Sequence, residues 1–133
     1  KTPFYHYTKF HIKSDDELKS ELSPVVDWIN PEIKNQNYFA LRQIIEKTEK
    51  NGIKLVIFTS PLHEYYSNTL SEKQKNDFFT MIKKLEEDYE LKIYDLEDEY
   101  VGLEVWGNIS HISYEKTVTE YNEDIARIII EEI

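Results

Sequence analysis

Hydrophobic positions in the middle of the chain follow two different regular patterns. In residues 37–50 apolar side chains recur every three or four positions, which predicts a helix, and Asn51-Gly52 is expected to end it. Residues 53–58 are then apolar except for Lys54, which is typical of a strand buried on both faces. The pattern therefore predicts a helix followed directly by a buried strand.

The same alternation of elements continues toward the C-terminus. Ser71 and Gln74 have the spacing of a capping box, which predicts the start of a second long helix. The apolar stripe of that helix consists of Phe78, Ile82, Leu85 and Tyr89. Residues 91–95 predict a second short strand, and residues 114–133 predict a last helix with Ser113 as its N-cap. The inward face of the last helix is expected to carry Val118, Tyr121, Ile125, Ile128 and Ile129.

The N-terminal part of the chain, residues 1–36, has the least regular pattern. Residues 4–12 are aromatic and alternate loosely, which favours a weak strand. Ser14 followed by an acidic first turn predicts a short helix that Pro24 limits, and Asn30-Pro31 predicts a turn.

The order of these elements favours a single α/β domain over residues 1–133. Helices and strands alternate as in a three-layer, mostly parallel sheet of the flavodoxin type, and the crossover between the two strands should be right-handed. Two strands alone do not make a stable sheet. Either residues 4–12 supply a third strand, or the chain holds a partial version of the sheet and pairs with something else.

Composition and charge narrow the classes of function. The 133 residues carry 16 basic and 26 acidic side chains, and the net charge of −10 would repel a nucleic acid. The absence of cysteine excludes disulfides, thiolate zinc sites and cysteine nucleophiles. The longest apolar run, residues 55–58, is too short to span a bilayer. Because the chain begins at Lys1 rather than Met, we expect a processed product or an excised part of a longer protein, with any anchor upstream.

Polar residues follow both predicted strands and precede the last helix. In open parallel sheets, ligands bind beyond the carboxyl ends of the strands, and the segment before the last helix must return to that edge if the helix packs antiparallel to the strands. The candidates for one site at this edge are Ser60, His63, Asp95, Asn108 and His111. Tyr65 and Trp106 are candidates for stacking on a sugar face. We expect neither a cofactor nor a metal ion in such a site.

The segment before the last helix resembles the last block of the SGNH (GDSL-type) hydrolases. It consists of Trp106-Gly107-Asn108-Ile109-Ser110-His111-Ile112, and in the family an Asp-x-x-His motif precedes the closing helix. The strand ending in Phe58-Thr59-Ser60-Pro61 and the strand with Tyr94-Asp95 are similar too. The resemblance covers roughly residues 37–133. It looks most like the divergent cell-envelope branch, which includes the teichoic-acid D-alanylation protein and alginate O-acetyltransferase-like proteins.

This resemblance implies an SGNH-like fold and either ester hydrolysis or O-acyl transfer on a carbohydrate or cell-envelope substrate, outside the cytoplasm or in the envelope. It also places His111 and Asn108 at catalytic positions. Asn108 stands where the family has aspartate, so it can accept a hydrogen bond but offers no negative charge to an imidazolium. The Gly-Asp-Ser nucleophile block of the family is absent, and Ser60 is the remaining candidate nucleophile. We therefore expect the isolated chain to be inactive.

Each candidate also has a structural interpretation. His111 can simply pack beside the last helix, a serine before proline is typical of a turn, and His63-Glu64 is too sparse for a metal site. Asn108-Ile109-Ser110 also matches a glycosylation sequon. Two hypotheses for the function follow. One is an SGNH-like esterase or acyltransferase whose nucleophile lies upstream or has been lost, and the other is a non-catalytic α/β binding or interaction module.

Overall fold

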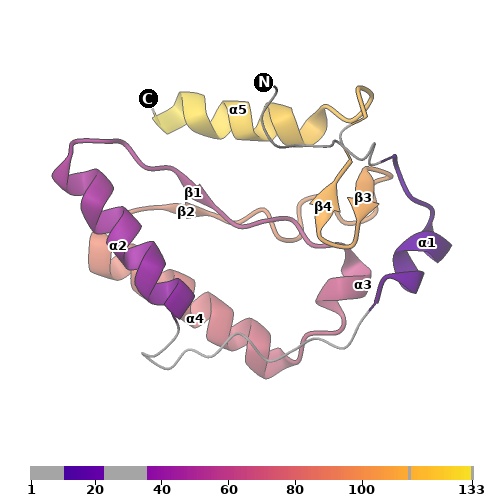
Figure 1. Ribbon diagram of the computed structural model, residues 1–133, viewed down its shortest axis with the longest axis horizontal. Helices are drawn as coiled ribbons and strands as arrows, with labels where there is room; N and C mark the ends of the chain where they lie inside the picture. The colour runs from indigo at the N-terminus through magenta and orange to yellow at the C-terminus, as the bar shows by residue number, and fades with distance from the viewer. Residues whose placement is uncertain (1–10, 23–35, 114, 133) are drawn as a thin grey trace, which may run out of the picture. The chain divides into compact units, whose positions relative to one another are not determined.

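The computed structural model describes residues 11–22, 36–113 and 115–132, which contain helices and short strands (Figure 1). They fall into two compact units, and the chain passes between the units four times. Unit 1 takes in the described residues of 11–22, 60–67 and 96–132, and unit 2 takes in those of 36–59 and 68–95. The expectation of one domain stays a prediction.

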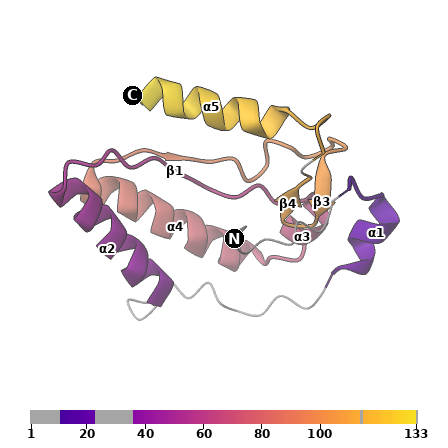
Figure 2. The same ribbon diagram turned by 45° about the horizontal axis from the view of Figure 1, so that its top comes forward.

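Unit 2 is a parallel strand pair with two helices packed on it. The strands β1 (Ile57–Phe58) and β2 (Ile93–Tyr94) pair in parallel, with Ile57 opposite Ile93 and Phe58 opposite Tyr94. The helices α2 (Gln36–Lys50) and α4 (Glu72–Tyr89) lie together on one side of this pair (Figures 1 and 2). Ile45 of α2, Leu85 of α4 and Ile93 of β2 form the buried core. The expected parallel pairing of the two strands is confirmed.

The helix ends of unit 2 follow local sequence signals. Ser71 caps α4 through the expected capping box, because its side chain accepts the N–H of Gln74 and the Gln74 side chain accepts the N–H of Ser71. Helix α2 ends at Lys50, and Gly52, two residues later, has φ of +64°. The N–H of Gly52 donates to Glu49 O and the N–H of Ile53 donates to Thr48 O, both at 2.9 Å. These two bonds are the Schellman motif, which requires a left-handed residue where Gly52 stands.

The strands of unit 2 are shorter than the sequence predicts. β1 contains only two residues of the expected 53–58, and Ile53 is 58% exposed. Leu55 and Ile57 pack against the core of unit 2 but are only half-buried. The expectation of a fully buried strand is therefore wrong, because apolar composition alone does not reveal how completely a strand is covered.

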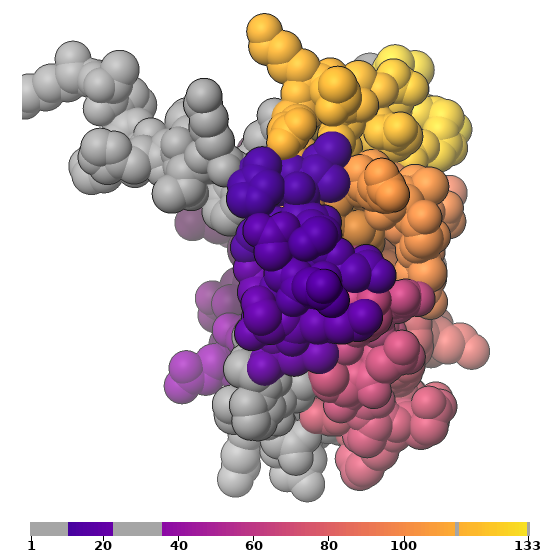
Figure 3. Space-filling model, turned by 90° about the vertical axis from the view of Figure 1, so that its right-hand side faces the viewer, coloured from indigo at the N-terminus to yellow at the C-terminus, as the bar shows by residue number. Residues whose placement is uncertain are grey.

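Unit 1 contains an antiparallel hairpin that the sequence did not predict. The strands β3 (Trp106–Asn108) and β4 (His111–Ile112) pair where we expected a loop. Helix α1 (Asp15–Ser20) starts at the predicted cap, Ser14, which forms a capping box with Glu17, and it ends before Pro24. A further short helix, α3 (Glu64–Ser67), was not predicted either. Figure 3 shows the indigo surface of α1 beside the orange surface of the later part of unit 1.

The last helix of unit 1 begins later than expected. Helix α5 covers Glu120–Glu132, and Thr119 O accepts the N–H of Glu123 at its first turn. Ser113 is buried well before α5 and its Oγ accepts the N–H of Glu115, so the expected N-cap role of Ser113 is wrong. Of the expected inward residues Ile128 is buried, whereas Ile129 is 41% exposed. Tyr100 anchors the helix by donating to Asp124 Oδ2 at 2.8 Å.

The architecture is thus a mixture of helices and short strands with one parallel pair. The predicted strand over residues 4–12 and the predicted turn at Asn30-Pro31 lie almost entirely outside the described residues. No helix within the described ranges is both long and apolar enough to cross a membrane.

Candidate functional site

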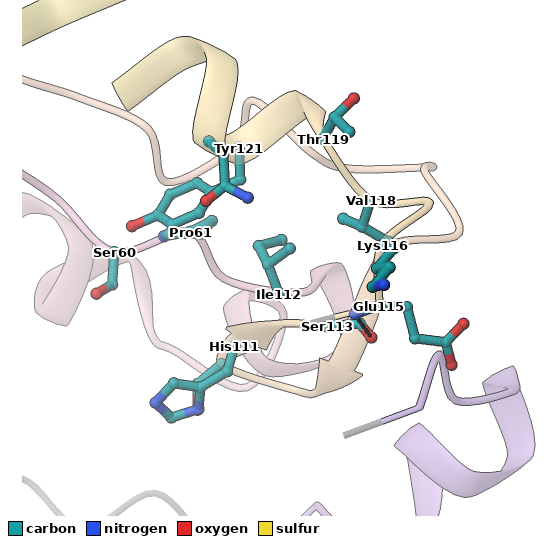
Figure 4. Close-up of a pocket in the computed structure, with 12 residues that line it drawn as sticks. Ser60, Pro61, His111, Ile112, Ser113, Glu115, Lys116, Val118, Thr119 and Tyr121 are labelled. Atoms are coloured by element: carbon teal, nitrogen blue, oxygen red, sulfur yellow. Dashed lines mark hydrogen bonds between the residues drawn. The ribbon is translucent and has the colours of Figure 1, made fainter. Parts of the chain in front are cut away.

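A cavity of about 390 Å³ lies in unit 1 between the hairpin, the segment at Ser60 and the start of α5. Its wall is partly apolar, from Pro61, Ile112, Val118 and Tyr121, and partly polar, from Ser60, Ser110, His111, Ser113, Glu115, Lys116, Thr119 and Asn122. Figure 4 shows Ile112 pointing from the hairpin toward Tyr121, while the ring of the preceding His111 points outward. Two residues of the predicted site, Ser60 and His111, therefore line one cavity.

A bulge in the hairpin sets which residues face each other. Trp106 pairs with Ile112 and Asn108 pairs with His111, so β3 advances two residues while β4 advances one. In a regular ladder, alternation would place Trp106 and Asn108 on the same face. With the bulge, Trp106 and Ile112 are buried, whereas His111 is exposed and Asn108 is half-buried. The bulge therefore lets a buried tryptophan and a solvent-accessible Asn–His pair share one short hairpin.

The side chains of Asn108 and His111 are hydrogen-bonded. Asn108 Oδ1 lies 2.9 Å from His111 Nδ1. The same oxygen accepts the backbone N–H of Ser110 at 2.9 Å. Since a backbone N–H can only donate, it fixes the amide oxygen, and not the amide nitrogen, toward the ring. The amide oxygen can only accept, so Nδ1 of His111 carries a hydrogen, and in the neutral ring Nε2 then has the lone pair.

Ser60 is exposed and lines the cavity. Within the described part of the chain its hydroxyl makes no hydrogen bond to His111, whose ring contacts are to Asn108 and Ser110. A serine nucleophile needs a base within hydrogen-bond reach, although this contact often tightens only when substrate binds. The position of Ser60 fits the wall of the site, and its role as a nucleophile stays a prediction.

His63, Tyr65 and Trp106 form an aromatic cluster that supports the hairpin. The His63 ring stands 4.5 Å from the Tyr65 ring and 5.1 Å from the Trp106 ring, centroid to centroid. His63 and Trp106 are buried, at 7% and 2% exposure, and neither they nor Tyr65 line the cavity. Their expected contacts with substrate stay a prediction, and the residues that line the cavity do not support it.

His63 is also the N-cap of α3. Its Nδ1 accepts the N–H of Tyr65 at 3.1 Å, and its backbone N–H donates to Ile109 O at 3.1 Å, in the turn of the hairpin. Burial lowers the pKa of His63 below its ordinary value, and the nearby carboxylates of Glu64 and Asp15 oppose this shift. The neutral ring is the form that can cap, because a protonated Nδ1 has no lone pair.

The remaining predicted residue, Asp95, belongs to unit 2. There its Oδ1 accepts the hydroxyl of Thr59 at 2.8 Å, at the ends of β1 and β2. No group of three or more His, Asp or Glu side chains in the described ranges is arranged to hold a metal ion.

Sequence reasoning found only Ser60 and His111 among the residues that line the cavity. Ser110 contacts both Asn108 and His111, while Tyr121 and Lys116 line the cavity from the far side. The hairpin itself was missed because its turn residues, Ile109 and Ser110, are not the residues typical of a two-residue hairpin turn. Only the two-residue separation of Asn108 and His111 is compatible with such a turn.

No protein-family model, curated protein or solved structure matches the chain.

Proposed function

We propose that the chain is an SGNH-hydrolase-like domain that handles an ester of a carbohydrate or of a cell-envelope polymer, by hydrolysis or by O-acyl transfer. His111 is the general base and Asn108 orients it. The observation that carries this proposal is the 2.9 Å bond between His111 Nδ1 and Asn108 Oδ1, on an exposed histidine that lines a cavity. In the neutral ring such a bond puts the lone pair on Nε2, the nitrogen that a general base uses.

In the proposed reaction Nε2 takes the proton of a serine hydroxyl, whose oxygen attacks the ester carbonyl. The proton then passes to the leaving alcohol as the tetrahedral intermediate collapses to an acyl-enzyme. Water releases the acyl group in hydrolysis, and an acceptor hydroxyl takes it in transfer. Asn108 keeps the ring in the productive tautomer but adds no charge to stabilise the imidazolium, so we expect slower turnover than with a carboxylate.

The proposal includes the three-layer, mostly parallel sheet of the family. It also includes a nucleophile that is not supplied by this chain. The parallel pairing of β1 and β2 supports the sheet. Ser60 lacks a hydrogen bond to His111 in the described part of the chain, which supports a nucleophile that lies upstream or has been lost. We therefore expect the 133-residue chain to hydrolyse p-nitrophenyl acetate no faster than buffer, without a burst.

The protein encoded by the whole gene provides the direct test. We expect it to release acetate from acetylated oligosaccharides, and His111→Ala to lower kcat by about 10²–10⁴-fold, the usual contribution of a general base. His11→Ala is the matched control, since His11 is an exposed histidine in the segment that precedes α1. Equal rates for wild type and His111→Ala would refute the proposed function. Turnover by the 133-residue chain that depends on both His111 and Ser60 would instead make Ser60 the nucleophile.

The second candidate is a non-catalytic binding module. It is favoured by the lack of a hydrogen bond between Ser60 and His111 in the described part of the chain, and by a cavity wall that contains five hydroxyl side chains, from Ser60, Ser110, Ser113, Thr119 and Tyr121. Calorimetry that shows binding of an oligosaccharide irrespective of its acetyl groups, without turnover by the whole protein, would favour this module over the esterase.

A further inference from the structure

Ser110 makes three contacts to the Asn108–His111 pair. Its backbone N–H donates to Asn108 Oδ1 at 2.9 Å, and its hydroxyl donates to the same oxygen at 3.2 Å. The hydroxyl oxygen also lies 3.1 Å from His111 Nδ1, where its lone pair can share the ring hydrogen. All three contacts converge on the two atoms that decide the state of the imidazole.

We propose that Ser110 is a positioning residue, which holds the amide of Asn108 in the orientation that keeps the hydrogen of His111 on Nδ1. The need for such a residue arises from asparagine itself. A carboxylate presents an acceptor to the ring whichever way it is turned, but an amide presents either its oxygen or its NH₂ group. If the NH₂ group faced the ring, Nδ1 would have to accept, the hydrogen would move to Nε2, and the base would be lost.

Loss of the base in this way is known from exchanging aspartate for asparagine in another enzyme. In a serine protease, replacing the orienting aspartate by asparagine lowers turnover by about 10⁴-fold, because the ring takes the wrong tautomer. In this chain two donors of Ser110 oppose the wrong orientation, since a flipped amide would bring its NH₂ group against the N–H of Ser110. The hydroxyl of Ser110 thus lets asparagine replace aspartate without loss of the tautomer.

The tautomer can be measured in the chain whether or not it turns over substrate. Nitrogen NMR of the ¹⁵N-labelled chain distinguishes the protonated from the unprotonated ring nitrogen, and His111→Gln identifies the signals of His111. We expect the Nδ1–H form in wild type. The pair Ser110→Thr and Ser110→Val has side chains of the same shape, and only threonine keeps the hydroxyl.

We expect Ser110→Thr to retain the wild-type ratio of Nδ1–H to Nε2–H, and Ser110→Val to lower it by about fivefold, the effect of one ordinary hydrogen bond. The backbone N–H remains in both variants, so the loss is partial. Ser20→Ala should change nothing, because Ser20 is exposed and its hydroxyl donates to Glu17 O within α1. An Nε2–H form in wild type, or equal ratios for the threonine and valine variants, would overturn the proposal.

The catalytic consequence rests on the proposed function, and the two can fail separately. In the protein encoded by the whole gene, Ser110→Val should lower kcat with KM unchanged, by at most about fivefold because kcat follows the fraction of the Nδ1–H form, and Ser110→Thr should restore it. Correct tautomers without any turnover would retain the positioning role of Ser110 and refute the esterase. Turnover that depends on His111, combined with identical tautomer ratios in the two variants, would refute the positioning role alone.

Discussion

His63 stabilises unit 1 with its ring and with its backbone. The neutral ring caps α3 and packs between Tyr65 and Trp106, while the backbone N–H holds the turn of the hairpin at Ile109. The residue thus links a short helix to the strands that carry Asn108 and His111. Because the cap needs the unprotonated Nδ1, its strength depends on pH.

We expect the stability of the chain to fall in mild acid through His63. Burial lowers the pKa of His63 from its ordinary 6.5, so the unfolded state binds more protons than the native state below that pH. The contribution of the neutral ring is complete above about pH 6.5 and is lost progressively as the pH falls toward the lowered native pKa. Urea unfolding of wild type and His63→Asn between pH 7.5 and 5 measures this loss.

In that comparison His63→Asn keeps an oxygen that can cap but removes the titration. The variant should be less stable by about 1–2 kcal/mol at pH 7.5, through lost ring packing, and should lose less stability than wild type on acidification. His11→Asn, at an exposed histidine, should keep the wild-type decline. Parallel pH profiles for wild type and His63→Asn would mean that the ring does not titrate as a buried cap.

At the scale of elements, the two long helices of unit 2 end differently. Helix α2 is followed by Gly52, which has φ of +64°, and a Cβ at that position would meet no atom within 4 Å. Helix α4 ends at Glu90, which has φ of 49° and carries a negative charge at the negative end of the helix dipole. The same left-handed conformation is thus occupied once by a residue suited to it and once by a residue that is not.

Glu90→Gly should therefore stabilise the chain by about 0.5–1 kcal/mol, and Gly52→Ala should destabilise it by about 1 kcal/mol through backbone strain alone. Glu87→Gly, an exposed exchange inside the last turn of α4, is the matched control and should cost about 1 kcal/mol. Denaturant unfolding measures all three. A loss of stability for Glu90→Gly similar to that for Glu87→Gly would show that the left-handed cap carries no strain.

The success of the sequence predictions also varies between elements, for a physical reason. Capping boxes at Ser14 and Ser71 and the stop at Gly52 depend on neighbours within a few residues, and all three were predictable. The length of β1 and the start of α5 depend on which distant segments cover them, and both predictions were wrong. The contact between Asn108 and His111 is likewise local, since it joins the two residues that flank one turn, whereas the bulge that exposes the pair depends on the burial of Trp106.

At the scale of the whole molecule, the two units are interleaved along the chain. The segment of residues 60–67 belongs to unit 1, yet both of its ends continue into unit 2. Thr59 N–H donates to Tyr94 O at the end of unit 2, and Leu62 N–H donates to Glu97 O soon afterwards in unit 1. The two chain segments are therefore paired both where they leave one unit and where they enter the other.

From this pairing we expect the units to unfold together. Leu85→Ala, at a fully buried position in the core of unit 2, should cost about 2–5 kcal/mol. With Trp28→Phe as background, Trp106 becomes the only tryptophan and its fluorescence reports on unit 1, while circular dichroism reports on all helices. Both probes should move to the same lower urea midpoint. A midpoint of Trp106 that Leu85→Ala leaves unchanged would show that the units unfold separately.

Interleaving also determines how the cavity can be inherited. Ser60 and Pro61 come from one stretch of unit 1 and the rest of the cavity wall comes from another, with residues 68–95 of unit 2 encoded between them. A single recombination breakpoint in that interval joins the hairpin histidine of one parent to the opposite wall of another. In such a recombinant, the side chains on the two sides of the cavity come from different parents and must still pack together. A breakpoint before Ser60 instead moves the whole wall together, because all the residues that line the cavity lie between positions 60 and 122.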